Sequence, residues 1–130
     1  MAKDKPTGWV IEEPRGEPSN PARWLVPLTS LLIFVQLLSG GTFLLADSEF
    51  GHVFTGLVVF TVAWFGVAGA MTMRPPARSV RVLAIVTFVL VLGAALFASK
   101  DTLLEHYGLA VAAFCVSTVS TVLALTRGRS

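Results

Sequence analysis

The sequence contains little charge and almost no cysteine. Charged residues make up 14% of its 130 residues, whereas a soluble domain carries about 25%. The mean hydropathy is +0.73, so the chain is not an ordinary soluble domain. Its single cysteine, Cys115, excludes an internal disulfide and a cysteine-rich zinc site.

Other absences exclude whole classes of function. No long apolar segment contains an Asp or a Glu, although a small multidrug-type transporter is expected to carry a carboxylate within a span. The chain has two histidines, both at the starts of apolar segments, so no nucleophile–histidine–acid set of a hydrolase can be assembled. Segments of about 10 residues that alternate apolar and polar positions, typical of a transmembrane barrel, are also missing.

The sequence has instead four apolar segments of similar length. A helix needs roughly 20 apolar residues to cross a hydrocarbon core of ~30 Å. Segments that are apolar on every side have no use in a soluble chain of this size. We therefore predict an all-α fold, an integral membrane four-helix bundle of two similar helical hairpins, with spans at 24–45, 52–73, 80–98 and 106–125.

The basic residues predict how the bundle is oriented. Loops on the cytoplasmic side of a membrane carry the excess of Lys and Arg. Nine of the ten basic residues lie in the flexible, Pro- and Gly-rich tail 1–23, in the segment 74–81 that joins the second span to the start of the third, or in the tail 127–130. We therefore expect the bundle, 24–126, in the cell membrane with both termini in the cytoplasm. Orientation then explains the basic loop, and no nucleic acid partner is expected.

The two histidines, His52 and His106, each open a span that runs from the outside to the inside. They are therefore expected at the same depth, near the outer face. Ionisable residues at membrane depth tend to face the bundle interior, and two imidazoles at one level can ligate a haem iron from both sides. The alternative is that each histidine sits in the headgroup layer as an amphipathic residue.

The residues that follow the two histidines repeat. Four positions on, each helix has a small residue, Gly56 or Ala110, and eight positions on each has a phenylalanine, Phe60 or Phe114. Residues four apart share a helix face, so a flat macrocycle bound at the histidine needs a small residue there. A duplicated hairpin with one histidine per copy predicts a site on a pseudo-twofold axis.

These motifs resemble the haem A synthase family over residues 24–125. The chain has a glycine-rich first helix, an outward loop, and then the Glu-x-x-His element, Glu49 to His52, opening the second helix. The family has eight spans in two four-helix bundles, and each bundle places two histidines around one porphyrin. The resemblance implies that His52 and His106 are the metal ligands and that Glu49 is a catalytic acid–base or proton carrier. A weaker resemblance extends to other b-type cytochrome bundles.

The cofactor predicted on these grounds is a haem of b or o type. Gly56 and Ala110 would lie beside the macrocycle, and Tyr107 is a candidate hydrogen-bond donor to a haem propionate. Zinc needs four ligands, and only flanking carboxylates could complete such a set: Asp47, Glu49, Asp101 and Glu105.

Two functions stay open. The first is a b-type-cytochrome-like protein for electron transfer or, if it is an enzyme, a haem-modifying oxidoreductase. Because the chain holds one bundle where the family has two, electrons would come from a homo-oligomer or from a respiratory partner. The second is a non-catalytic accessory subunit of a larger respiratory membrane complex, which the small size and the lack of a soluble domain favour.

Overall fold

The computed structural model describes the backbone of residues 21–46, 49–73 and 76–127, and their side chains except those of 41–46, 49, 100 and 127. Over these residues the chain forms four long helices and one 3₁₀ turn: α1 (Ala22–Ala46), α2 (Glu49–Thr72), α3 (Arg78–Leu96), η1 (Lys100–Thr102) and α4 (Leu103–Arg127). Most of the predicted tails, residues 1–20 and 128–130, lies outside the described residues.

All four predicted spans are helices that are long and apolar enough to cross a membrane. The candidate spans are Ala22–Gly40, Phe50–Thr72, Arg78–Leu96 and Leu103–Thr126. The predicted fold class, an all-α four-helix membrane bundle, is confirmed. The helix ends differ from the predicted ones by a few residues, because α1 begins at 22 instead of 24 and α4 begins three residues before its histidine.

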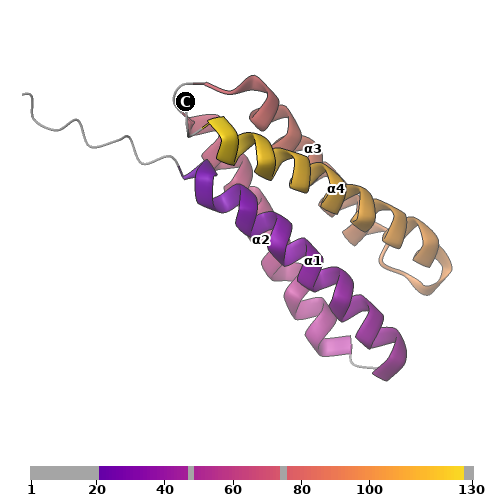
Figure 1. Ribbon diagram of the computed structural model, residues 1–130. Coiled ribbons are helices and arrows are strands. Elements are labelled where there is room, and N and C mark those ends of the chain that lie inside the picture. Colours follow the sequence, from indigo (N-terminus) through magenta and orange to yellow (C-terminus); the bar gives the residue numbers. More distant parts are fainter. Residues whose placement is uncertain (1–20, 47–48, 74–75, 128–130) are drawn as a thin grey trace, which may run out of the picture.

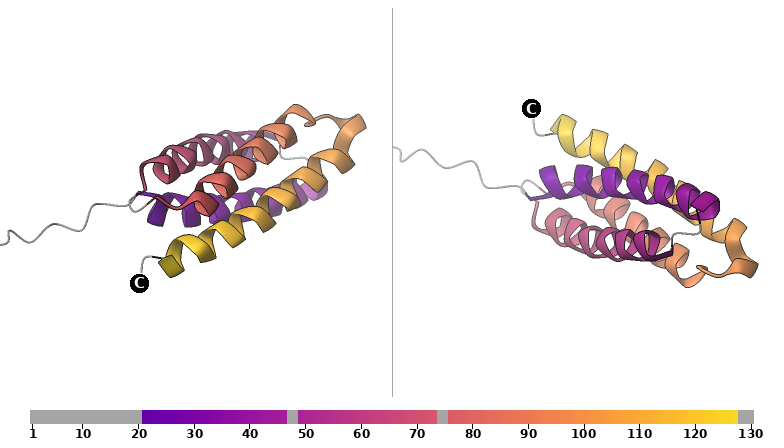
Figure 2. Two further views of the ribbon diagram at one scale, coloured as in Figure 1. Left: turned by 90° about the horizontal axis from the view of Figure 1, so that it is seen from above. Right: turned by 90° about the horizontal axis from the view of Figure 1, so that it is seen from below.

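The helices form two antiparallel hairpins that lie side by side. α1 pairs with α2 and α3 with α4, while α1 also packs on α4 and α2 on α3 (Figure 1 and Figure 2). Figure 1 shows the hairpins close together where α1 begins and α4 ends, and farther apart at the opposite end. We call these the narrow end and the wide end.

Large apolar side chains cover the outside of the bundle. Trp24, Phe50 and Leu104 are 79%, 84% and 83% exposed. In water such a surface is costly, whereas in a bilayer it faces lipid chains of the same polarity. The distribution of exposed side chains therefore agrees with a multi-pass membrane protein.

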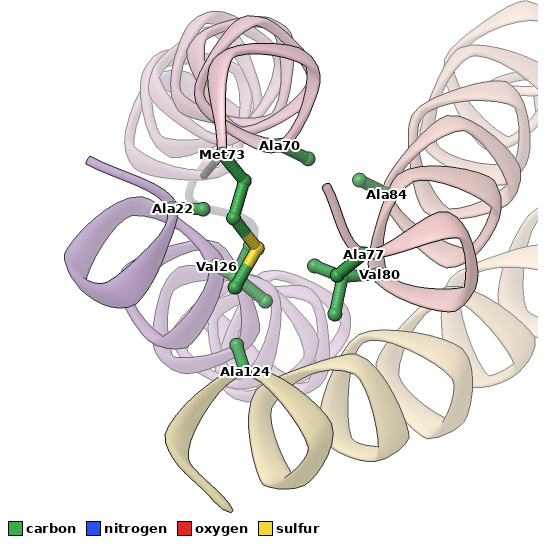
Figure 3. Packing of buried hydrophobic residues seen from close by; sticks show 8 residues of the cluster. All are labelled: Ala22, Val26, Ala70, Met73, Ala77, Val80, Ala84 and Ala124. Carbon is green, nitrogen blue, oxygen red and sulfur yellow. The ribbon is translucent and has the colours of Figure 1, made fainter. Parts of the chain in front are cut away.

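Small residues fill the narrow end instead. One buried cluster there joins all four helices, and five of its eight members are alanines, which let helix backbones approach closely. Figure 3 shows the side chain of Met73 among them. The members are Ala22, Val26, Ala70, Met73, Ala77, Val80, Ala84 and Ala124.

Arg81 of α3 closes the narrow end. Its Nε and Nη2 donate to the carbonyl oxygens of Ala70 and Met71 at 3.1 and 3.0 Å. These carbonyls belong to the last turn of α2, where no helical partner exists, and a cation is favourable at that end of a helix. Arg81 therefore ties the two hairpins together in addition to its part in the charge pattern.

Buried hydroxyls form the next layer toward the wide end. Thr29, Thr87 and Ser117 donate to carbonyl oxygens one turn earlier in their own helices, at 2.7, 2.8 and 2.9 Å. Such bonds satisfy a hydroxyl without a partner helix. Ser30 and Thr118 lie 3.3 Å apart and join α1 to α4. An apolar layer follows, with Ile33, Val59 and Ala113 buried.

Gly69 provides a test of the close packing at the narrow end. A Cβ at this position would lie 3.2 Å from the backbone nitrogen of Ala22 and 3.1 Å from Cδ1 of Leu25. We expect Gly69→Ala to lower the free energy of unfolding in detergent by about 1–3 kcal/mol, because the site is already full. Gly108→Ala is the matched control, since nothing lies within 4 Å of a Cβ there. Equal effects of the two variants would contradict the packing argument.

Candidate functional site

His52 and His106 meet at the wide end of the bundle. Each is the fourth residue of its helix, α2 and α4 respectively. Their ring centroids are 6.0 Å apart, and the ring planes make an angle of 77°. Both side chains are half-buried. The structure thus brings together the two residues that the sequence places at one depth.

The imidazole of His106 is held by the backbone of α3. Its Nδ1 lies 2.6 Å from the carbonyl oxygen of Ala94. A carbonyl only accepts a hydrogen bond, so we assign the proton to Nδ1 on this geometry. The lone pair of His106 then lies on Nε2, which is the nitrogen left for a ligand or a metal.

The imidazole of His52 is held by polar side chains of α1. The hydroxyl of Ser39 donates to the carbonyl oxygen of Gln36 at 2.9 Å, and Ser39 Oγ lies 3.1 Å from Nδ1 of His52. A hydroxyl can donate as well as accept, so this contact orients the ring of His52 whichever of its nitrogens carries the proton.

Gln36 connects α1 to α2 beside this histidine. Its Nε2 donates to the backbone oxygen of His52 at 3.0 Å and lies 3.3 Å from Nδ1 of the same residue. The hydroxyl of Thr55 donates to Gln36 Oε1. Gly56 leaves the space for this amide, because a Cβ there would lie 3.0 Å from Gln36 Nε2. Gln36 is the only amide within a predicted span, which is the one sequence signal for this network.

A cavity of about 370 Å³ lies between the two hairpins at the histidines. This volume falls in the range of about 300–1,000 Å³ usual for small-molecule and cofactor sites. Most of its lining residues are apolar, and the polar side chains among them are those of Gln36, His52, His106 and Tyr107. A mostly apolar pocket with a few convergent polar groups is typical of a ligand site.

The lining of the cavity repeats between the hairpins. Adding 58 to a residue number in α1 gives the equivalent residue in α3 or just after it. Adding 54 to a residue number in α2 gives the equivalent residue in α4. Among the described residues, sixteen of the eighteen that line the cavity form such pairs: Ile33 with Val91, Gln36 with Ala94, Leu37 with Ala95, Gly40 with Ala98, His52 with His106, Val53 with Tyr107, Gly56 with Ala110, and Val59 with Ala113. The cavity therefore lies on a pseudo-twofold axis between similar hairpins.

The other predicted site residues take different places. Ala110 and Tyr107 line the cavity, and so does Phe60. Phe114 packs against Phe34 of α1 with ring centroids 5.7 Å apart. Glu49 is the first residue of α2, and its side chain lies outside the described part of the chain.

The metal-ligating side chains do not form a zinc-type set. Within the described residues, no group of three or more His, Cys, Asp and Glu could hold a metal ion. Asp101 and Glu105 are exposed, while Asp47 lies outside the described residues. The two imidazoles alone supply two of the four ligands that tetrahedral zinc needs.

Comparisons of the chain with protein-family models, with curated proteins and with solved structures found no match. The functional interpretation therefore rests on the geometry of the site.

Thr55→Val tests the polar link between α1 and α2 at the site. The change keeps the shape of the side chain and removes the hydroxyl that donates to Gln36. We expect the free energy of unfolding in detergent to fall by about 0.6–1.7 kcal/mol, the range found for hydrogen bonds between membrane helices. Thr61→Val is the matched control on the same helix, because the Thr61 hydroxyl is exposed and donates to Leu57 O of its own helix. If Thr55→Val lowered the free energy of unfolding no more than Thr61→Val does, the link would be contradicted.

Proposed function

We propose that the protein binds one haem, of b or o type, between His52 and His106 and uses it for electron transfer or for haem handling of the haem A synthase kind. The observation that carries the proposal is the 6.0 Å separation of the two ring centroids. Two imidazole nitrogens that bind one metal from opposite sides lie about 2 Å from it. Such binding places the ring centres about 6 Å apart, close to the separation observed.

The hydrogen bonds of the two imidazoles support the same proposal. A metal-binding histidine usually donates its second ring N–H to a carbonyl or another polar group, which fixes its tautomer and orientation. The Ala94 carbonyl does this for His106, and the Ser39 hydroxyl lies 3.1 Å from the equivalent Nδ1 of His52. Nε2 of His106 is thereby placed as a ligand nitrogen.

The shape of the cavity is also suitable for a flat macrocycle. One turn after each histidine the wall is small, at Gly56 and Ala110, and Gly40 and Ala98 form a second small pair. Bulky side chains at these positions would occupy the space beside the imidazoles. The largely apolar lining matches the body of a porphyrin.

A haem held in this way supplies one-electron chemistry between Fe(II) and Fe(III). The part of the chain is to hold both imidazoles in place and to surround them with apolar groups that limit water. Tyr107, whose hydroxyl lies near Gly40, is proposed to donate to a propionate. Glu49 is proposed as the acid–base group if the haem is modified, on the basis of the Glu-x-x-His motif alone.

The charge pattern extends the proposal to orientation and partners. Nine of the ten basic residues lie in the two tails or between the second and third spans of the sequence. By the positive-inside rule both termini lie in the cytoplasm and the histidines near the outer face of the cell membrane. A single bundle with one haem needs an electron donor or acceptor. We therefore propose a homo-oligomer or a larger respiratory membrane complex as the working state.

The proposed haem is tested by the absorbance spectrum of the purified protein. From haem-replete cells, we expect a reduced-minus-oxidised spectrum with a low-spin α band and about one haem per chain. His52→Ala and His106→Ala should each abolish the low-spin band because an axial ligand is lost. Cys115→Ala, an exposed position on α4 away from the cavity, is the control and should keep it.

A colourless preparation of full yield would overturn the haem proposal. The chain would then keep its four-helix membrane fold, and the accessory-subunit alternative would be favoured. The accessory-subunit alternative would also be favoured if the chain co-purified stoichiometrically with a respiratory complex and still did so after both histidine substitutions.

The proposed orientation is tested by thiol labelling in intact cells. In a Cys115→Ala background, Ser99→Cys at the wide end should react with a membrane-impermeant maleimide. Ser130→Cys, at the C-terminus, should react only after the membrane is opened. The reverse pattern would contradict cytoplasmic termini.

A further inference from the structure

The cavity has its mouth between α2 and α3. Four of its lining residues are exposed, and all four belong to these two helices or follow α3 directly. Val53 and Leu57 are 62% and 63% exposed, and Ala95 and Ala98 are exposed as well. The lining residues on α1 and α4 are all buried or half-buried. The cavity is therefore covered along the contact of α1 with α4 and open along the contact of α2 with α3.

One residue pair explains why only one side is open. The pseudo-twofold axis relates the α1–α4 contact to the α2–α3 contact. At the α1–α4 contact, Tyr107 reaches across to Gly40, and its hydroxyl lies 3.3 Å from where a Cβ of Gly40 would lie. At the α2–α3 contact, the residues equivalent to Tyr107 and Gly40 are Val53 and Ala98. A valine is too short to span the same distance, so the aromatic ring closes one side and its equivalent leaves the other open.

The mouth opens toward lipid. Val53 and Leu57 lie within the candidate span Phe50–Thr72, and Ala95 lies within Arg78–Leu96. Among the described lining residues there is no Asp, Glu, Lys or Arg. A charged ligand arriving from water would have no group to meet it there, whereas an apolar molecule dissolved in the bilayer meets side chains of its own polarity.

We propose that the opening between α2 and α3, bordered by Val53, Leu57, Ala95 and Ala98, is a lateral entrance through which a tetrapyrrole dissolved in the bilayer reaches the two histidines. This inference rests on the proposed haem function and names the route by which the site is filled. Tyr107 blocks the equivalent route on the opposite side. The chain therefore takes its haem from the membrane and not from the aqueous phase.

The entrance is tested by closing it with the residue that closes the opposite side. Apoprotein in phosphatidylcholine vesicles is given hemin either dissolved in the same bilayer or bound to serum albumin in water. For Val53→Tyr we expect uptake from the bilayer to slow by about tenfold or more, with the final haem content unchanged. Phe54→Tyr, an exposed neighbour outside the cavity lining, is the matched control and should load at the wild-type rate.

A double variant moves the entrance instead of closing it. Val53→Tyr combined with Tyr107→Val exchanges the two equivalent residues, so the opening should shift to the α1–α4 side. We expect uptake from the bilayer to be faster than in Val53→Tyr alone. Ala98→Leu, from the other border of the mouth, provides a second closing variant in case Val53→Tyr fails to fold. Unchanged uptake in both closing variants, or faster loading from albumin than from the bilayer, would overturn the lateral entrance.

A second measurement separates this inference from the proposed function. In a Cys115→Ala background, Ala110→Cys places a thiol on the cavity wall. We expect it to react with a lipid-soluble maleimide and not with a charged one, and Val53→Tyr should slow that reaction. The labelling reaction does not require haem. A wild-type protein without a haem spectrum would therefore contradict the proposed function, while the labelling would still test the entrance. Equal labelling by the charged reagent would overturn the entrance alone.

Discussion

The bundle depends on the close approach of helix backbones at small residues. Within a bilayer, burying an apolar side chain against another helix gains little, because the lipid is equally apolar. Association must come from closely fitting surfaces, and Ala22, Ala70 and Ala124 are at most 1% exposed. These contacts are concentrated at the narrow end, together with the hydrogen bonds from Arg81. Fixed there, the hairpins diverge toward the wide end, and the divergence leaves room for the cavity.

The similarity of the two hairpins explains how one histidine per hairpin can form a two-histidine site. A residue that lies close to a twofold axis also lies close to its equivalent, and the rings of His52 and His106 are 6.0 Å apart. The hydrogen bonds around the two imidazole rings also involve equivalent positions in the two hairpins. The carbonyl of Ala94 accepts directly from His106. The equivalent carbonyl, that of Gln36, accepts from Ser39, whose hydroxyl oxygen lies 3.1 Å from Nδ1 of His52. The two histidines are thus held by equivalent carbonyls in two different ways.

The sequence predicted the parts that depend on length and periodicity. The four spans follow from runs of apolar residues, and the equal depth of the two histidines follows from their positions at the starts of spans that run in the same direction. Which side of each helix faces inward could not be predicted, because segments that are apolar all round carry no stripe. A lone amide within a span suggests a bridge between helices, but the partner of Gln36, Thr55, could not be predicted because it depends on helix rotation and side-chain rotamers. The sequence predicted that Gly56 leaves space for a macrocycle. In the structure, the amide of Gln36 lies 3.0 Å from where a Cβ of Gly56 would be.

The surroundings of the two histidines depart from twofold symmetry. Polar groups gather on one side, where Gln36, Ser39 and Thr55 surround His52. The equivalent positions beside His106 are apolar: Ala94, Phe97 and Leu109. A duplicated hairpin that began as two equal halves would have been differentiated by a few side chains without changing its helix packing.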